Sequence, residues 1–277
     1  MNKDCCILLF SYNRPSHLKR VVISLENYKV NNLYIILDGP KNNKDKLIQK
    51  EIITNVLGEN KIKIKLIKRK KNIGLARSIY TALDDFSKKY KKIIVLEDDC
   101  IPRKEFFSFI KKSFYLSMND DEIAAICGYQ LPQLHNKNFS KLKILKLKHF
   151  IPWGWAIISK NWQYFRKNFK KVNFNYDKKN LPPNLKKIIK KTKNNEKNIW
   201  SKNFIIFNFI NKKFYLFPDK SLIKNIGFDG SGVNSKITDI FYTKYFKSRK
   251  ISNEIIEKKK IIYKQEQNLI KLVDYYY

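Results

Sequence analysis

The chain has 277 residues and a formal net charge of +34, because 58 lysines and arginines outnumber 24 aspartates and glutamates. Hydrophobic residues make up 43% of the sequence and aromatic residues 14%, which is enough for a packed core and excludes a chain that is disordered throughout. No stretch of about 18 consecutive apolar residues occurs, so we expect no transmembrane helix. The first apolar run, residues 5–10, is too short for a signal peptide, and we expect a cytoplasmic protein.

The excess of lysine has two interpretations. Lysine, asparagine and isoleucine are all abundant and spread along the chain, as mutational bias in an AT-rich genome would produce. A positive field would also attract an anionic lipid surface, where a lipid-linked acceptor would reside. We therefore hold open a peripheral contact with the inner face of a membrane, and nucleic acid is the less favoured partner.

The first half of the chain alternates apolar runs with amphipathic segments. Continuous or alternating apolar runs predict strands, and apolar residues at helical spacing predict helices. The expected strands are residues 5–10, 33–37, 62–67 and 93–96, and the expected helices are residues 17–26, 46–57 and 76–90. Strands and helices that alternate in this way are typical of βαβ units, so the sequence predicts an α/β fold with a mainly parallel central sheet.

The second half is less regular. Its expected elements are a helix at 106–118, strands at 124–128 and 214–218, an aromatic turn at 152–155 before a further strand, and a glycine-rich loop at 225–232. Residues 168–197 are rich in lysine and asparagine, which is typical of a surface excursion. From Asn253 onward the charged pattern predicts a C-terminal helix.

Polar side chains follow three of the expected strands. Asn13 and Arg14 follow the first, Asp38 follows the second, and the acidic triplet of residues 97–99 follows the fourth. In parallel sheets, ligands bind outside the carboxyl ends of the strands. The sequence therefore predicts that these side chains converge on one edge of the sheet.

The triplet Glu97-Asp98-Asp99 places three carboxyl groups directly after a buried strand. Adjacent carboxylates repel one another, which raises the cost of ionising them unless a cation is present. A hard divalent ion with oxygen ligands would relieve the repulsion, and a diphosphate can complete its coordination. In the alternative interpretation, two of the carboxylates cap the helix that starts near Arg103.

A second candidate site is the segment of residues 72–78. Gly74 allows a close approach of the backbone at a helix start, and Arg77 could reach a phosphate. An ordinary junction between a loop and a helix, with a solvated arginine, explains the same residues equally well.

Taken in order, these motifs resemble those of glycosyltransferases with the GT-A fold. The motifs are Phe10-Ser11-Tyr12-Asn13-Arg14-Pro15, Leu37-Asp38-Gly39, Asn72-Ile73-Gly74-Leu75-Ala76-Arg77, Val95-Leu96-Glu97-Asp98-Asp99, Pro152-Trp153-Gly154-Trp155 and residues 218–232. They are most similar to bacterial family 2 enzymes and to N-acetylglucosaminyltransferase I, over about residues 4–235. The resemblance implies a GT-A (Rossmann-like) nucleotide-sugar-binding fold. It implies a glycosyltransferase domain at 1–240, with a donor part at about 1–120, an acceptor part at about 121–240 and a C-terminal helical extension at 241–277.

The resemblance also implies a role for each matching residue. The implied donor site comprises Ser11, Asn13 and Arg14 in the nucleotide pocket, Asp38 at the base, Gly74 and Arg77 along the ribose and diphosphate, and Asp98 at the ribose or sugar. Asp99 would bind Mn²⁺ or Mg²⁺. Trp153 and Trp155 would form an apolar wall for the sugar ring or the acceptor, with packing in the core as the alternative.

The general base is less defined by the resemblance. Three carboxylates, Asp177, Glu196 and Asp229, lie in the region where related enzymes place it, and we favour Asp229 because a glycine-rich loop could close over the donor. A turn aspartate that binds its own backbone is the alternative. Relatives often carry a histidine where this chain has Asn234, which weakens the case for a histidine ligand from this loop.

Together these features predict a metal-dependent, inverting glycosyltransferase. It would move a sugar from a nucleotide-sugar donor to a hydroxyl of a glycan or lipid-linked glycan, in the assembly of bacterial surface polysaccharide. A sugar-phosphate nucleotidyltransferase is one alternative, although residues 11–16 lack the glycines of its phosphate loop. A non-enzymatic basic protein that binds nucleic acid or lipid is the other.

Overall fold

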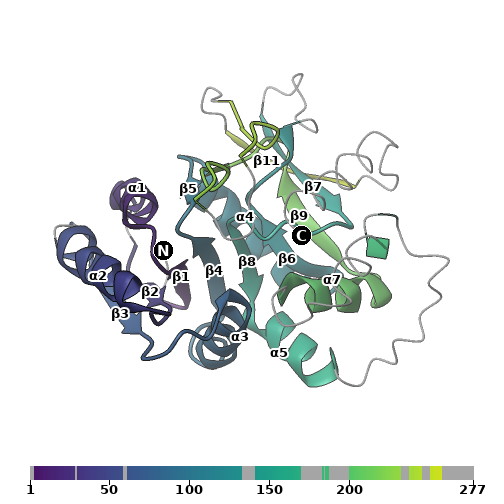
Figure 1. Ribbon diagram of the computed structural model, residues 1–277. Coiled ribbons are helices and arrows are strands. Elements are labelled where there is room, and N and C mark those ends of the chain that lie inside the picture. Colours follow the sequence, from purple (N-terminus) through teal and green to yellow (C-terminus); the bar gives the residue numbers. More distant parts are fainter. Residues whose placement is uncertain are drawn as a thin grey trace.

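A computed structural model describes residues 3–28, 30–58, 61–132, 141–169, 183, 185, 186, 200–231, 237–244 and 250–257. A nine-stranded sheet with the order β11-β7-β9-β6-β8-β4-β1-β2-β3 runs through the molecule, with helices on both faces (Figure 1). Five of the strand pairs are parallel and three are antiparallel. The predicted α/β class with a mainly parallel sheet is confirmed.

The first half of the chain forms the parallel part of the sheet. The strands are β1 (Cys5–Ser11), β2 (Leu33–Leu37), β3 (Ile64–Lys68) and β4 (Lys92–Glu97), in the order β3-β2-β1-β4. The helices between them are α1 (Pro15–Glu26), α2 (Asn43–Glu51) with the π-helical turn η1 (Ile52–Leu57), and α3 (Leu75–Phe86). This is the strand order of one half of a Rossmann-like sheet, in which ligands bind between the first and fourth strands.

The second half adds strands of both directions. They are β6 (Ile123–Cys127), β7 (Leu142–Leu147), β8 (Trp155–Ile158), β9 (Phe214–Pro218) and β11 (Ile251–Glu257). The strand β8 lies antiparallel between β4 and β6, so it joins the two halves of the sheet. A separate pair of short strands, β5 (Cys100–Pro102) and β10 (Ile223–Asn225), connects the end of β4 with the later part of the chain.

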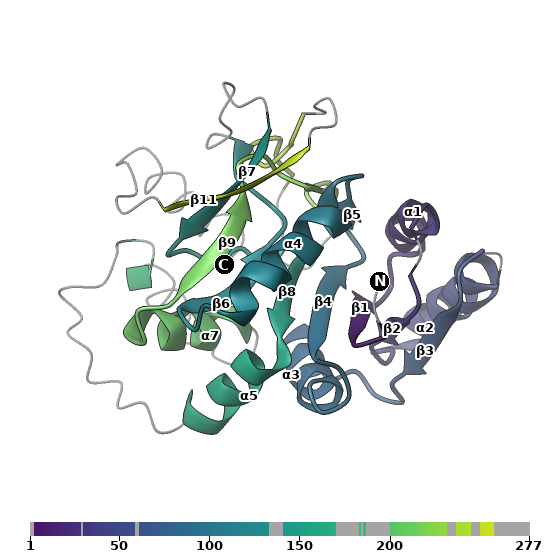
Figure 2. The same ribbon diagram turned by 180° about the vertical axis from the view of Figure 1, so that it is seen from behind.

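Helices cover the sheet on both sides. The helices α3, α5 (Ser159–Asn168) and α7 (Trp200–Ile210) lie together on one face, and α4 (Phe106–Met118) lies on the other, as Figure 2 shows from behind. The core beneath α5 and α7 is aromatic, with Trp155 stacked on Trp200 at a centroid distance of 5.1 Å. Within the described residues, no helix is both long and apolar enough to cross a bilayer.

The sequence prediction of a helix from Asn253 onward is wrong where the structure describes it. Residues 251–257 form β11, which pairs in parallel with β7 at the outer edge of the sheet. The charged pattern resembles a solvated helix, but an unpaired strand edge offers backbone hydrogen bonds that override local preference. The sequence analysis also did not predict β7, α5 and α7, and residues 258–277 lie outside the described part.

The core contains a buried histidine, His149. His149 is 5% exposed and its ring lies 4.6 Å from that of Phe217. Neither ring nitrogen has a hydrogen-bond partner within the described residues. Burial lowers the pKa of His149 to about 3, so the folded protein keeps this imidazole neutral.

We expect His149→Leu to make the fold less sensitive to acid. The unfolded chain protonates this histidine near pH 6.5 and the folded chain only near pH 3, so stability falls as the pH drops from 6.5 towards 3. The loss is about 2 kcal/mol by pH 5, at roughly 1.4 kcal/mol per pH unit. Urea unfolding of wild type and variant at pH 7 and pH 5 measures it. Equal losses in the two proteins between these pH values would contradict the assignment.

Candidate active site

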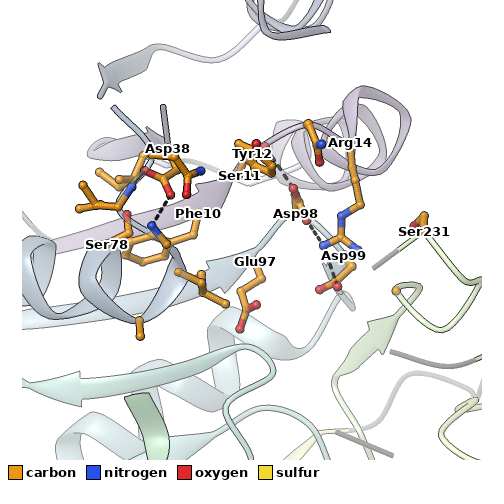
Figure 3. A pocket seen from close by; sticks show the side chains of 18 of the residues that line it. Phe10, Ser11, Tyr12, Arg14, Asp38, Ser78, Glu97, Asp98, Asp99 and Ser231 are labelled. Carbon is orange, nitrogen blue, oxygen red and sulfur yellow. Dashed lines mark hydrogen bonds and ion pairs between the residues drawn. The ribbon is translucent and has the colours of Figure 1, made fainter. Parts of the chain in front are cut away.

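A cavity lies at the carboxyl ends of β1, β2 and β4 (Figure 3). Its walls come from four parts of the chain: residues 10–14, Asp38 and Lys41 with residues 72–76, the triplet 97–99, and Trp153 with residues of the loop 225–231. The predicted convergence of polar side chains on this edge of the sheet is confirmed.

Strand register explains why these side chains meet. Ser11 on β1 is paired with Leu37 on β2, so Asp38 follows at the same level. Phe10 is paired with Glu97 on β4, which brings Asp98 beside Ser11. The Ser11 hydroxyl donates a hydrogen bond of 3.1 Å to Asp98 Oδ2. Pro15 then starts α1 directly after this strand end, because its fixed φ and missing N–H suit the first turn of a helix.

The guanidinium of Arg14 is placed between two carboxylates. Its Nη2 forms ion pairs with Asp98 Oδ1 and, at 2.9 Å, with Asp99 Oδ2. Burial raises the pKa of Asp98, and the positive charge of Arg14 offsets part of this effect. Arg14 thus pairs with two adjacent carboxylates and offsets the effect of burial on Asp98.

Glu97 has no such partner. Its Oε1 is buried and makes no hydrogen bond within the described residues. Figure 3 shows its carboxyl group directed away from Arg14, whereas Asp98 and Asp99 point towards it. Burial, and then the negative charges of Asp99 and Asp98, raise the pKa of Glu97 well above its ordinary value. The three acids of the triplet are therefore not equivalent.

Asp38 holds the loop that forms the opposite wall. One carboxylate oxygen accepts hydrogen bonds from the backbone N–H of Gly39 (2.9 Å) and Ile73 (3.1 Å), and the other accepts one from Gly74 (2.9 Å). Gly74 has a φ of +77°, which a side chain would strain. The predicted contact of Asp38 with a base stays a prediction, and the structure gives this carboxylate a role in positioning residues 73 and 74.

The loop after β10 packs against the acidic triplet. The N–H of Ile226 donates to the carbonyl of Asp99 at 2.9 Å. A Cβ on Gly227 would lie 2.2 Å from Asp99 Oδ2, so only glycine permits this approach. Sequence analysis marked this segment as a glycine-rich loop, but it did not assign Gly227 or Phe228 to the site.

Asp229 does not line the cavity, although it is close to it. Its Oδ1 accepts hydrogen bonds from the N–H and hydroxyl of Ser231, and its Oδ2 lies 3.1 Å from His17 Nε2. Burial raises the pKa of Asp229, but the hydrogen bonds from Ser231 and the nearby His17 outweigh it, so the pKa lies below its ordinary value. These contacts agree with the alternative of a turn aspartate. Asp177 and Glu196 lie outside the described residues.

The two tryptophans and Arg77 have different places. Trp153 lines the cavity and packs edge-to-face on Phe228 at 5.1 Å. Trp155 is completely buried and does not line the cavity. This agrees with the alternative interpretation, in which this side chain packs in the core. Arg77 is exposed and does not line the cavity, whereas Gly74 does.

The charges of the cavity suit a divalent cation together with a diphosphate. The described residues that line it carry four carboxyl groups, Asp38, Glu97, Asp98 and Asp99, against two cations, Arg14 and Lys41. Within the described residues, no three His, Cys, Asp or Glu side chains form a metal-binding group. A Mg²⁺- or Mn²⁺-type ion, however, is commonly held by one or two carboxylates and completed by substrate phosphates. The donor set at Asp98 and Asp99 fits that mode.

No family model and no curated protein match the sequence. Among solved structures, the chain is similar to a mannosyltransferase from Pyrobaculum calidifontis in complex with GDP-Man and Mn²⁺, at 10% identity and a TM-score of 0.38, over 56% of this chain and 44% of that one. It is similar to a cytidylyltransferase from Leptospira borgpetersenii at 11% identity and a TM-score of 0.38, over 69% of this chain and 74% of that one. It is also similar to the glycosyltransferase GlyE from Streptococcus pneumoniae, at 13% identity and a TM-score of 0.37, over 78% of this chain and 45% of that one.

We expect Asp38→Asn to loosen the loop of residues 72–74 in the ligand-free protein. An amide has one acceptor oxygen where the carboxylate has two, and its NH₂ group would face a backbone donor. The expected cost is about 1–3 kcal/mol. Hydrogen exchange at the Ile73 and Gly74 amides, compared with an Asp121→Asn control at an exposed site, measures the change. Unaltered exchange at both amides would show that Asp38 does not hold the loop.

Proposed function

We propose that this protein is a metal-dependent, inverting glycosyltransferase that uses a nucleotide-sugar donor. The observation that carries the proposal is the cavity itself. A loop held by Asp38, the strand end with Ser11 and Arg14, and the acidic triplet line one site at the carboxyl edge of a Rossmann-like sheet. Nucleotides and their diphosphates bind at this position in such sheets.

The division of the cavity suggests how the donor would lie. The nucleoside would occupy the part between Tyr12, Asp38 and the loop 72–74, and the diphosphate would lie towards Arg14 and Asp99. The sugar would then face Trp153 and Phe228, whose rings form the apolar end of the lining. Aromatic faces of this kind suit the C–H surface of a sugar ring.

A divalent ion would be held by Asp99, with Asp98 beside it. When bound, the ion would neutralise charge on the departing nucleoside diphosphate. Other residues of the chain position the parts of the site. Ser11 keeps Asp98 oriented through its hydrogen bond, Asp38 keeps residues 73 and 74 against the donor, and Gly227 brings the later loop close to Asp99.

In the proposed inverting transfer, a carboxylate acts as the general base and takes the proton of the acceptor hydroxyl as that hydroxyl attacks the anomeric carbon. Asp229 is the described candidate, but a lowered pKa and three hydrogen-bonding contacts make it a weak base. The assignment of the base to Glu196 or Asp177 stays a prediction, since both lie outside the described residues.

The proposed acceptor is a hydroxyl of a glycan or lipid-linked glycan in bacterial surface polysaccharide assembly. The support is the strong positive charge of the chain, which would favour contact with an anionic membrane surface from the cytoplasmic side. Polybasic attraction of this kind falls off with ionic strength, so sedimentation with anionic vesicles at low and high salt tests it.

A screen of nucleotide sugars by thermal shift, with and without Mn²⁺, tests the donor class. A bound donor stabilises the fold by mass action, so the melting temperature rises with its concentration. A nucleotidyltransferase would instead be stabilised by a nucleoside triphosphate with a sugar phosphate and would release pyrophosphate. A basic binding protein would respond to neither, and its binding would not depend on the triplet.

We expect Asp99→Asn to remove most of the metal-dependent affinity for a nucleoside diphosphate while the fold stays intact. The amide is neutral and offers the metal a weaker ligand, so binding should weaken by about tenfold or more. Calorimetric titration with nucleoside diphosphate and Mn²⁺ measures this. An Asp121→Asn variant serves as a control, because that side chain is 88% exposed and forms a surface ion pair with Lys160. Unchanged affinity in Asp99→Asn would contradict the assignment of Asp99 as the metal ligand.

A further inference from the structure

We propose that Arg14 occupies the cation position of the acidic triplet in the ligand-free protein, and that a divalent ion has to displace it from Asp99. The displaced guanidinium would then become a ligand of the diphosphate. This inference rests on the proposed function, because it concerns the same site, but it makes a separate statement about metal binding alone.

The two cations would need the same oxygen atoms. Asp99 Oδ2 accepts from Arg14 Nη2 at 2.9 Å, and Gly227 packs against the same oxygen. The other oxygen of Asp99 accepts from the Cys100 thiol at 3.3 Å. Of the Asp98 oxygens, Oδ1 is paired with Arg14 and Oδ2 accepts from Ser11. No carboxylate oxygen of this pair is without a neighbour on the protein.

Simultaneous binding is electrostatically unfavourable. A metal ion at normal Mg²⁺ or Mn²⁺ bond length from Asp99 Oδ2 would be within a few ångströms of a guanidinium nitrogen that contacts the same atom. Two cations at that separation in a partly buried site repel strongly, because the local dielectric screens them poorly. Arg14 is only 18% exposed, so solvent does little to weaken this repulsion.

A released Arg14 has a use within the cavity. Its planar group carries five N–H donors in a geometry that matches two phosphate oxygens at once. The residue stands at the N-terminal end of α1 and lines the same cavity as the triplet. The metal displaces Arg14, and the diphosphate offers this guanidinium a new partner. The diphosphate in turn draws Arg14 away from Asp99, and the metal replaces it there. The metal and the diphosphate should therefore bind cooperatively.

The test compares Arg14→Met with wild type in a calorimetric titration with Mn²⁺ alone. We expect the variant to bind Mn²⁺ about tenfold or more tightly, since it lacks the competing cation. Arg166→Met is the matched control, because Arg166 forms a 2.9 Å ion pair with Asp84 outside the cavity. That control should bind Mn²⁺ as wild type does. Equal or weaker Mn²⁺ binding by Arg14→Met, or no Mn²⁺ binding by any variant, overturns the proposal.

A second measurement separates competition from a purely structural role of Arg14. With Mn²⁺ saturating, Arg14→Met should bind a nucleoside diphosphate about tenfold or more weakly, although it binds the metal more tightly. Damage to the fold would weaken both. If Arg14→Met does not fold, Arg14→Gln decides the question, because its amide can still donate a hydrogen bond but carries no competing charge. We expect this variant to bind Mn²⁺ more tightly than wild type, and unchanged binding overturns the proposal. A wild type that binds Mn²⁺ but no nucleotide would contradict the proposed function and leave the competition at Asp99 intact.

Discussion

The pairing of β1 with β2 on one side and β4 on the other is the constraint on which the site depends. Because all three strands are parallel and in register, Ser11, Asp38 and Asp98 emerge at one level of the sheet. A slip of one residue in either pairing would turn the corresponding side chain to the other face. The strands are buried along almost their whole length, so apolar packing holds this part of the sheet together. The polar site is thus positioned by apolar packing.

The same arrangement creates an electrostatic problem at the end of β4. Three acids follow one another where solvent access is low. Burial raises the pKa of Glu97 and of Asp98, and the negative charge of Asp99 raises both further. The three acids are compensated unequally, since Arg14 pairs with Asp98 and Asp99 while Oε1 of Glu97 has no hydrogen-bond partner within the described residues. In the proposed function, this imbalance would make the site sensitive to a bound cation or diphosphate.

Much of the first half could be predicted from sequence, because buried parallel strands appear as short apolar runs. The predicted strand at residues 33–37 is the observed β2, and the polar clusters after β1, β2 and β4 line one cavity. The second half was harder. The helix α7 has buried residues on all sides and no clear amphipathic pattern, and β11 depends on an edge of β7 that is distant in sequence. The role of Asp38 in holding residues 73 and 74 also depends on a contact across more than thirty residues of the chain.

The cavity is lined by residues from both halves of the chain, and the division into a donor part before residue 120 and an acceptor part after it stays a prediction. The later chain reaches the acidic triplet through the pairing of β10 with β5 and through the hydrogen bond from Ile226 to Asp99. Gly227 then lies against the carboxylate that we assign to the metal, and Trp153 and Phe228 complete the wall. A change in the position of the Asp99 carboxylate therefore alters the packing of the loop 225–231, and a movement of this loop alters the surroundings of Asp99. In the proposed glycosyltransferase, the position of this loop and the occupancy of the cation position would be parts of one equilibrium, and the later half of the chain would then influence donor binding directly.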